Sequence, residues 1–459
     1  MNDLHTGSLT RELAERLGAS SLINDDGDRN DVDLNRIGAA HDAAPEFLDA
    51  LGDLVEAGLV GHRRLCVLTV HGWNVVQPAV DMGLGVRPSL AALVGGGESA
   101  VSRAFATSVL PRLAARLSAC GIAATPGLRY PARARENVLQ LFTTRYQDDT
   151  RPVVRRLARL ADRVDAVQLE LSLPLRLPGA WRDAFVKACA GALGDEGGGA
   201  ALDVWPTWTC DSARATEPVA LEFVAPGLAG LAAVDEHGGR LLLFPDGGGL
   251  FTFTGERAGA HDPDQVAGLR ITATPSGDVD VSYHGPMLVF PDTAPFVDLE
   301  AGLARASITT AEVTLRFGPS HDHGVEACPF GDVRGHAQIG ERRFDVAGHG
   351  VRTRREVGLG AWPRAGLRLA DGTVIVGRGA DGLICRNGTH VRLSGCVIQG
   401  DDATVSIGVE AADGTRLDVA AVVVHRLPVV PGEPGAGRVV FAACRHDDAL
   451  AGWIALRSA

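Results

Sequence analysis

The chain has 459 residues, of which 46% are hydrophobic, and its formal net charge at pH 7 is −12. This length suits about two or three domains of ordinary size, which can bury apolar cores without disulfide support. The acidic balance argues against a nucleic-acid or anionic-membrane partner, because no basic field would attract a polyanion.

The N-terminal segment, MNDLHTGSLTRELAERL, mixes polar and apolar residues and lacks the basic and apolar regions of an export signal. No apolar run of the sequence reaches the roughly 18 to 20 residues that a membrane-spanning helix requires. The eight cysteines are scattered and contain no CxxC pair, which is typical of reduced thiols. These features predict a cytoplasmic protein that acts on or binds a small molecule, with no membrane and no nucleic acid as partner.

The first part of the chain alternates short apolar runs with segments of helical period. Leu9, Leu13 and Leu17 share one helical face and predict a helix that ends at Gly18. The other expected elements are strands at 21–23, 65–70, 138–142 and 166–171, and helices at 47–58, 152–161 and 180–193. Because strands alternate with helices, we expect an α/β domain over residues 1–192, with a mixed sheet and flanking helices.

The pattern changes after the glycine-rich segment GDEGGG at 194–199, and we place a linker at 193–216. Beyond it, apolar residues alternate with polar ones, as in strands with one buried face. Turn pairs such as Asn387-Gly388 join these runs into hairpins. We therefore expect an all-β domain over residues 217–459, either one lipocalin-like or calycin-like barrel or two tandem barrels.

Polar segments follow or adjoin the expected strands of the first domain. They are VDLNR at 32–36, His71-Gly72 directly after the run 65–70, and Gln168-Leu169-Glu170 with Arg176 beyond it. Open α/β sheets place their sites at such strand ends. A neutral imidazole can bind zinc, a carboxylate can take a proton from metal-bound water, and an Asn-Arg pair can grip a substrate carboxylate. These side chains suggest a hydrolytic site.

The residues VDLNR (32–36), the strand followed by HG (71–72), and VQLELSLPLR (167–176) resemble those of the N-formylglutamate amidohydrolases. The order of these parts is also similar to that in the zinc carboxypeptidases. The resemblance covers residues 1–192 and implies zinc-dependent hydrolysis of an amide next to a carboxylate, as in an N-acyl amino acid. It implies that Glu170 is the general base that activates the attacking water.

The resemblance also implies the residues that hold the substrate and the metal. Asn35 and Arg36 would bind the substrate carboxylate, with Arg176 nearby, and His71 would be a zinc ligand. The remaining ligands of the family come from before the DLNR segment, where this sequence has Asp3 and His5. We expect these two residues in that role, and the alternative is a metal site that is truncated or lost.

Each of the central residues also has a structural interpretation. His71 is then a hydrogen-bonded histidine at a strand end, Glu170 forms a salt bridge to Arg176, and Arg36 forms an ion pair with Asp33. Structural ion pairs of this kind perturb titratable groups as functional sites do. The sequence alone therefore leaves both interpretations open.

The segments GHAQIG (335–340) and FDVAGHGVR (344–352) of the second domain resemble the carotenoid hydratase (hydroxyneurosporene synthase) family of lipocalin-like barrels. Trp362 and the pair Asp371-Gly372 also fit the layout of that family. The resemblance implies a barrel that encloses one small hydrophobic ligand, and hydration of an alkene by an acidic residue. Thr353 stands where the family has its Asp, and Glu356 is the alternative acid.

Two functions follow from these patterns. The first is a zinc-dependent amidohydrolase that acts on an N-acyl amino acid or a related carboxylate. The alternative is a lipocalin-like protein that binds, hydrates or otherwise modifies a hydrophobic metabolite of terpenoid or polyketide type, with the α/β domain as scaffold. The presence of both domains in one chain suggests a tailoring step in secondary metabolism.

Overall fold

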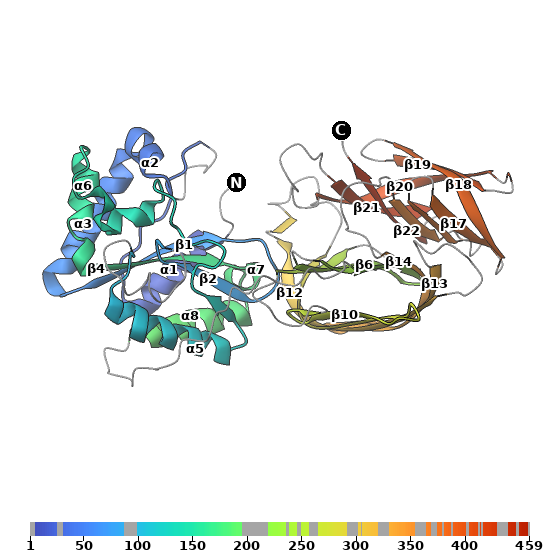
Figure 1. The fold of residues 1–459 in the computed structure, drawn as a ribbon, viewed down its shortest axis with the longest axis horizontal. Helices are drawn as coiled ribbons and strands as arrows, with labels where there is room; N and C mark the ends of the chain where they lie inside the picture. Colours follow the sequence, from blue (N-terminus) through green and yellow to red (C-terminus); the bar gives the residue numbers. More distant parts are fainter. Residues whose placement is uncertain are drawn as a thin grey trace. The chain divides into compact units, whose positions relative to one another are not determined.

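The chain forms two compact units, Met1–Trp208 and Thr209–Ala459 (Figure 1). In the computed structural model the described residues are 5–24, 31–86, 99–194, 219–235, 238–245, 249–256, 265–291, 302–303, 305–319, 330–353, 364–368, 374–378, 381–386, 389–400, 404–411, 414, 416–428, 439–446 and 449–457. Asp3, Glu356, Trp362, Asp371-Gly372, Asn387-Gly388 and most of the predicted linker at 193–216 lie outside the described residues.

The first unit is built on a mixed four-stranded sheet. Its strands lie in the order β1 (Leu65–Gly72), β4 (Val164–Leu171), β2 (Ala79–Gly83) and β3 (Ala123–Thr125). β1 runs parallel to β4, whereas β2 runs antiparallel to β4 and parallel to β3. This sheet and its helices confirm the expected α/β class of the N-terminal domain.

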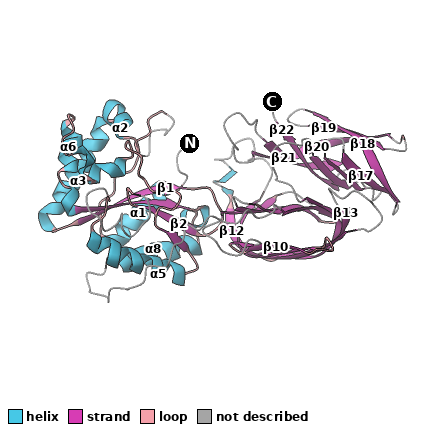
Figure 2. Cartoon of the chain, in the orientation of Figure 1, coloured by secondary structure: helices cyan, strands magenta, loops and turns pink. Residues whose placement is uncertain are grey.

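Helices cover both faces of the sheet (Figure 2). On one side, called the α1 face, α1 (Thr6–Leu17), α5 (Leu110–Ala119) and α8 (Ala180–Leu193) share one apolar core with the sheet. On the other side, called the α3 face, α3 (Pro45–Gly61), α6 (Pro152–Ala158) and the 3₁₀ helix η2 (Val138–Phe142) form a second core. The shorter elements are α2 (Ile37–Ala43), η1 (Phe105–Val109), η3 (Thr144–Tyr146), η4 (Ala161–Arg163) and α7 (Leu173–Arg176). Among the described helices, none is long and apolar enough to cross a membrane.

Residues 138–142 form the 3₁₀ helix η2 and not the expected strand. Every side chain of this segment is buried, so its apolar run reflects burial on all sides rather than a strand of the sheet. Asn137 caps the helix, because its side-chain oxygen accepts a hydrogen bond from the backbone N–H of Leu139 at 2.9 Å. A short buried run has no periodicity that distinguishes a strand from a helix. The expected strand at 21–23 is likewise not found.

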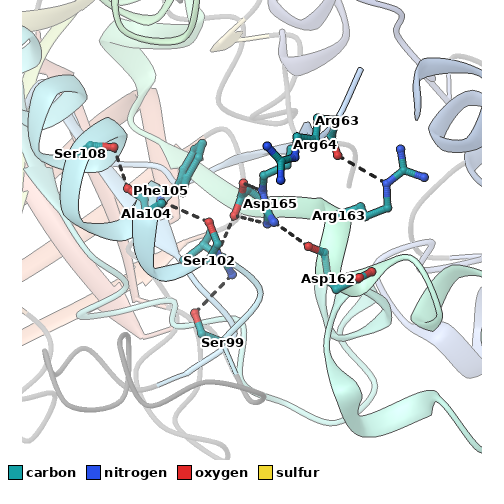
Figure 3. A network of polar contacts seen from close by, with 11 residues as sticks. Arg63, Arg64, Ser99, Ser102, Ala104, Phe105, Ser108, Asp162, Arg163 and Asp165 are labelled. Carbon is teal, nitrogen blue, oxygen red and sulfur yellow. Dashed lines mark hydrogen bonds and ion pairs between the residues drawn. The ribbon is translucent and has the colours of Figure 1, made fainter. Parts of the chain in front are cut away.

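Asp165 connects the beginnings of β1 and β4 to the segment before η1 (Figure 3). Its carboxylate accepts hydrogen bonds from Nε and Nη2 of Arg64 at 3.0 and 3.2 Å, and from the backbone N–H of Ser102 at 2.5 Å. Arg64 also donates to the carbonyl oxygen of Asp162 at 2.6 Å. Because Asp165 is buried, this paired arrangement satisfies a charge that would otherwise destabilise the fold.

The second unit begins with a closed β-barrel. Its strands follow the order β12, β13, β14, β5, β6, β7, β8 and β11, and β11 also pairs with β12, which closes the ring. The hairpin of β9 and β10 extends from β11. The strands are β5 (Val219–Ala225), β6 (Leu228–Val234), β7 (Gly238–Pro245), β8 (Leu250–Glu256), β9 (Gln265–Val266), β10 (Leu269–Ala273), β11 (Val279–Phe290), β12 (Ser307–Pro319), β13 (Phe330–Ile339) and β14 (Arg342–Thr353).

Strict alternation along β12 shows how the sequence specifies this barrel. Ala311, Val313, Leu315 and Phe317 are buried, while the residues between them are exposed. A strand residue and its partner on the neighbouring antiparallel strand point to the same side of the sheet. The buried residues of β12 and β13, and those of β11 from Val279 to Met287, therefore face the interior together, and the polar residues between them face outward.

A second closed barrel follows along the chain. Its strands are β15 (Arg364–Arg368), β16 (Val374–Arg378), β17 (Asp381–Arg386), β18 (Thr389–Gly400), β19 (Thr404–Ala411), β20 (Arg416–Pro428), β21 (Val439–His446) and β22 (Ala449–Arg457). Each pairs with its neighbour in sequence, and β15 pairs with β22 to complete the ring. The expected all-β barrel class of the C-terminal domain is confirmed.

Candidate functional site

Residue alternation along β1 assigns each side chain to one face of the sheet. Leu68 and Val70 belong to the core on the α1 face, whereas Leu65 and Val67 belong to the core on the α3 face. Continued to the carboxyl end of the strand, this alternation places His71 on the α3 face. His71 is half-buried there.

The same reasoning places Glu170 beside His71. Val164 and Ala166 of β4 belong to the core on the α3 face, so Glu170 points to that face as well. The register sets Glu170 opposite His71 on β1 and opposite Asp81 on β2. The structure therefore brings His71 and Glu170 together, as the predicted site requires, and adds Asp81 to them.

Hydrogen bonds from neighbouring buried side chains orient the Glu170 carboxylate. Nε2 of Gln168 donates to Oε1 of Glu170 at 2.7 Å, and Nδ2 of Asn137 donates to Oε1 of Gln168 at 2.9 Å. All three side chains are buried, and hydrogen bonds in such low-dielectric surroundings reinforce one another. No role was predicted for Asn137 or Gln168 from the sequence. We call Asn137, Gln168 and Glu170 the Glu170 series.

The DLNR segment lies against the Asn137 end of this series. Arg36 forms an antiparallel bridge with Asn137, and the backbone N–H of Val138 donates to the carbonyl oxygen of Asn35 at 3.1 Å. The Arg36 guanidinium lies 3.5 Å from the Asp33 carboxylate, and its side chain is 52% exposed. An exposed pair of this kind is weak, so the guanidinium stays accessible to an anion. Asn35, Arg36 and Glu170 are thus joined by one continuous set of contacts.

Asp81 has a structural role in this arrangement. Its carboxylate accepts hydrogen bonds from Oγ1 of Thr125 at 2.5 Å and from the backbone N–H groups of Leu128, Arg129 and Tyr130 at 3.0, 2.9 and 2.6 Å. These bonds hold the loop after β3 against β2, and the side chain is 1% exposed. The sequence signal for such a residue was an acid inside the apolar run AVDMG at 79–83.

Arg176 lies on the α1 face, away from the Glu170 series. Its guanidinium packs against Gly72, where a side chain would collide with it. Its Nη2 donates to the Trp73 carbonyl oxygen at 3.2 Å and to Oδ1 of Asn74 at 2.8 Å. Arg176 therefore holds the segment that follows β1. The structure does not place it with Arg36 on the α3 face.

His5 also belongs to the α1 face, where it begins α1 with a left-handed backbone (φ 63°). Burial is the largest cause that lowers the pKa of His5, and the nearby guanidinium groups of Arg182 and Arg176 lower it further. Arg182 is itself held by Glu12, with Nε and Oε2 at 2.7 Å. Burial and these guanidinium groups thus favour the neutral form of the His5 imidazole.

The described donors do not form the zinc site that the resemblance implies. Within the described residues, no group of three or more His, Cys, Asp or Glu side chains could hold a metal ion. His71 and Glu170 share one face of the sheet, but His5 lies on the opposite face beside guanidinium groups that repel a cation. Asp3 lies outside the described residues. The zinc ion and its ligand set therefore stay a prediction.

The interior of the first barrel is sealed at one end, called the Arg352 end. Phe317 and Arg352 face inward and are buried there. Val266 and Leu269, from the hairpin of β9 and β10, pack against Gly239 at the same end. Thr353, at the position of the hydratase Asp, ends β14.

The interior opens at the other end, called the Arg342 end. Val289, Thr309 and Phe344 face inward by their register and are half-buried, and Ser307 and Arg342 are exposed. Farther along the same strands the inward-facing residues are buried, apart from Gly285, Gly348 and Pro319, which are half-buried. Among the described residues of these strands, the exposed inward-facing side chains thus lie at the Arg342 end.

Two aromatic rings and one guanidinium meet at the Arg342 end. The ring centroids of Phe251 and Phe344 are 6.1 Å apart, with their planes at 59°. Cζ of Arg342 lies 5.2 Å from the Phe251 centroid and 5.1 Å from the Phe344 centroid. These distances are typical of a cation–π contact.

The middle of the barrel is apolar, and its buried hydroxyl is satisfied. Tyr283 packs its ring 4.7 Å from that of Phe253 and donates its hydroxyl hydrogen to the carbonyl oxygen of Pro286. Burial raises the pKa of Tyr283 far above its usual value, so the phenol stays neutral. The barrel therefore offers an apolar interior with polar groups at its ends.

Comparisons with known proteins do not reveal a family. No protein-family model matches the sequence, and no curated protein matches it. The α/β domain thus has no support beyond its own residues for the amidohydrolase resemblance.

Comparison with solved structures finds distant similarities that involve about half of the chain. The crystal structure of CghA with Sch210972 has 8% identity and a TM-score of 0.31, over 52% of this chain and 86% of that protein. The crystal structure of CghA has 10% identity and a TM-score of 0.31, over 53% and 88%. An uncharacterized protein, YLR301w of Saccharomyces cerevisiae, has 11% identity and a TM-score of 0.18, over 53% and 98%. Similarity this low supports no functional inference.

Proposed function

We propose that the first barrel of the C-terminal unit binds an apolar or amphiphilic small molecule of terpenoid or polyketide type. The observation that carries this proposal is the contrast between the half-buried or exposed inward-facing side chains at the Arg342 end and the buried Phe317 and Arg352 at the other end. A barrel of this strand number can hold one small ligand, and ligand sites lie preferentially in the mouths of barrels. The half-buried apolar residues Val289 and Phe344 would be covered when a ligand enters.

A neutral lipophilic dye, Nile red, tests this proposal on the full-length protein. We expect saturable fluorescence enhancement with one site per chain. Phe344→Ser should weaken the affinity by roughly tenfold, because a bound ligand would cover the half-buried phenyl ring and lose this apolar contact in the variant. Ala347→Ser is the matched control, since Ala347 lies on the exposed outer face of the same strand. Enhancement that does not saturate, or that Phe344→Ser leaves unchanged, would contradict ligand binding at this end of the barrel.

The Glu170 series favours a second function, for the α/β unit. We propose that this unit hydrolyses an amide in a substrate that carries a carboxylate, as in an N-acyl amino acid. Glu170 would accept the proton of the attacking water, oriented by its hydrogen bond from Gln168. The accessible guanidinium of Arg36 would hold the substrate carboxylate. No step is assigned to zinc, because the described donors do not form its site.

Steady-state kinetics with a panel of N-acyl amino acids test the second function. Glu170→Gln should lower kcat by roughly a hundredfold or more, as expected for a lost general base. Arg36→Gln should raise KM with a smaller change in kcat, because it removes substrate binding rather than proton transfer. Glu46→Gln, on the exposed side of α3, is the control for the loss of one acid. Absence of hydrolysis in the unaltered protein would exclude this function for the panel.

A further inference from the structure

We infer that Arg342 binds the acidic head of the barrel's ligand, which is therefore an amphiphile with a carboxylate at one end and an apolar body. This inference rests on the proposed binding function of the first barrel and names the class of ligand. It depends on the direction of the Arg342 side chain, on its contacts with two aromatic rings, and on the described carboxylates nearby, which do not pair with it.

Arg342 faces the interior of the barrel, although it lies at the end of a strand. It pairs with Ile339 across the hairpin of β13 and β14, and Ile339 is buried. Paired residues point to the same side of a sheet, so Arg342 points inward and the next residue, Arg343, points outward. Its contacts with the rings of Phe251 and Phe344 agree with this direction.

The contact with the two rings leaves N–H donors of Arg342 available, because the side chain is exposed. A guanidinium carries five N–H donors in one plane, and an aromatic ring offers its π face and accepts no conventional hydrogen bond from them. Phe251 is buried and Phe344 is half-buried, which gives the guanidinium a fixed support. The donors are thus presented at the opening of an apolar interior. A carboxylate accepts from such a planar fork through both of its oxygens.

The protein supplies no anion of its own to Arg342 in the described structure. Asp345, the nearest carboxylate along β14, lies on the outer face and contacts Arg343, with Oδ1 and Nε 3.4 Å apart. Glu341 lies in the turn before Arg342, and the described residues show no ion pair between them. A cation that has aromatic support and no carboxylate partner among the described residues suits an anion that arrives with the ligand.

The opposite end of the barrel also contains an inward-facing arginine, but its guanidinium is buried and hydrogen-bonded to the protein backbone. Arg352 pairs with Leu221 and faces inward, and its Nη1 donates to the carbonyl oxygen of Gly277 at 2.9 Å. Arg352 is 5% exposed, and its hydrogen bond to Gly277 connects β14 to the turn between β10 and β11 at the sealed end. Arg342 and Arg352, the two inward-facing arginines at opposite ends of β14, therefore set the ligand's orientation. The acid lies at Arg342, and the apolar body extends toward Arg352.

A fluorescent fatty acid and its uncharged ester test the inference on the full-length protein. The probes are cis-parinaric acid and its methyl ester, titrated at pH 7 and moderate salt. In the unaltered protein we expect the acid to bind roughly ten- to a hundredfold more tightly than the ester, the range expected for a charge-assisted pair. Arg342→Gln should weaken binding of the acid by that factor and leave the ester unchanged. Arg343→Gln is the matched control, because it removes the same charge from the outer face and should change neither affinity.

The outcomes separate this inference from the binding function. If neither probe binds the unaltered protein, the binding function itself is wrong. If both bind with equal affinity and Arg342→Gln changes neither, the barrel binds apolar ligands and the inference about the acid is wrong. Equal weakening of acid and ester by Arg342→Gln would mean that Arg342 only packs, which also overturns the inference. Arg342→Lys, which keeps the charge without the planar fork, should retain part of the preference for the acid and checks that the loss is not misfolding.

Discussion

Asp81 and Glu170 face each other across β2 and β4, yet their surroundings give them different roles. The Asp81 carboxylate accepts four hydrogen bonds, three of them from the backbone of one loop. Glu170 accepts a hydrogen bond from the Gln168 side chain and lies beside the half-buried His71, at the carboxyl end of its strand. A carboxylate whose lone pairs are occupied by fixed backbone donors stabilises structure, whereas a carboxylate beside an imidazole at a strand end can take part in proton transfer.

We predict that Asp81→Ala destabilises the protein by about 3 kcal/mol or more, because it leaves buried backbone N–H groups without an acceptor. Urea unfolding, followed by far-UV circular dichroism, measures this change in the free energy of unfolding. Asp53→Ala is the control, since the Asp53 side chain is 72% exposed in its pair with Arg156 and should change stability by less than about 1 kcal/mol. Equal losses for the two variants would refute the structural role of Asp81.

At the scale of secondary structure, hydrophobic periodicity predicted the elements that bury one face and expose the other. The inward and outward alternation of β12 reflects the one face that this strand buries. The continuous apolar run of β1 predicted a strand correctly, although β1 is the edge strand of its sheet and is mostly half-buried. The run at 138–142 has neighbours on every side, so its apolar residues carry no period and the predicted strand is a helix. Asn137, just before the run, was the local sign of a helix start.

For the candidate site as well, the sequence predicted which residues lie at strand ends but not which face of the sheet they occupy. Strand ends predicted that His71 and Glu170 would be neighbours, because parallel strands end at one edge of the sheet. Which face a residue occupies depends on parity and tertiary packing, and this separates Arg176 and His5 from Glu170. The inward direction of Arg342 depends on the register of β13 and β14, which no short motif encodes.

The strands β12 and β13 approach each other so closely at Gly335 of β13 that no larger residue fits there. Gly335 has a φ of 152°, and a Cβ there would collide with the carbonyl oxygen of Thr314. Gly335→Ala should cost about 3 kcal/mol or more in unfolding free energy, because backbone atoms cannot move aside as a side chain can. Gly227→Ala is the control, since Gly227 has a φ of 79° but open space around it, and strain alone costs about 1–2 kcal/mol. Chemical denaturation should rank the two losses in this order, and the reverse order would contradict the close approach.

At the scale of the whole molecule, the chain combines two units that each have their own core. The α/β unit buries apolar residues on both faces of its sheet, and the first barrel buries its own inward-facing residues. Each unit also carries its own candidate site, one built on a carboxylate and the other on an aromatic pair with a guanidinium. Sites with separate supporting residues are expected to act independently.

Independence of the two sites is a testable property of the full-length protein. We predict that Glu170→Gln leaves the affinity for cis-parinaric acid within about twofold, and that Arg342→Gln leaves kcat for N-acyl amino acids within about twofold, because effects at unconnected sites add. The double variant should show both losses at their single-variant size. Fluorescence titration and steady-state kinetics on the same preparations measure the two properties. A loss of hydrolysis in Arg342→Gln, or a change in its KM when the fatty acid is present, would show that the two units act on one ligand and would contradict independence.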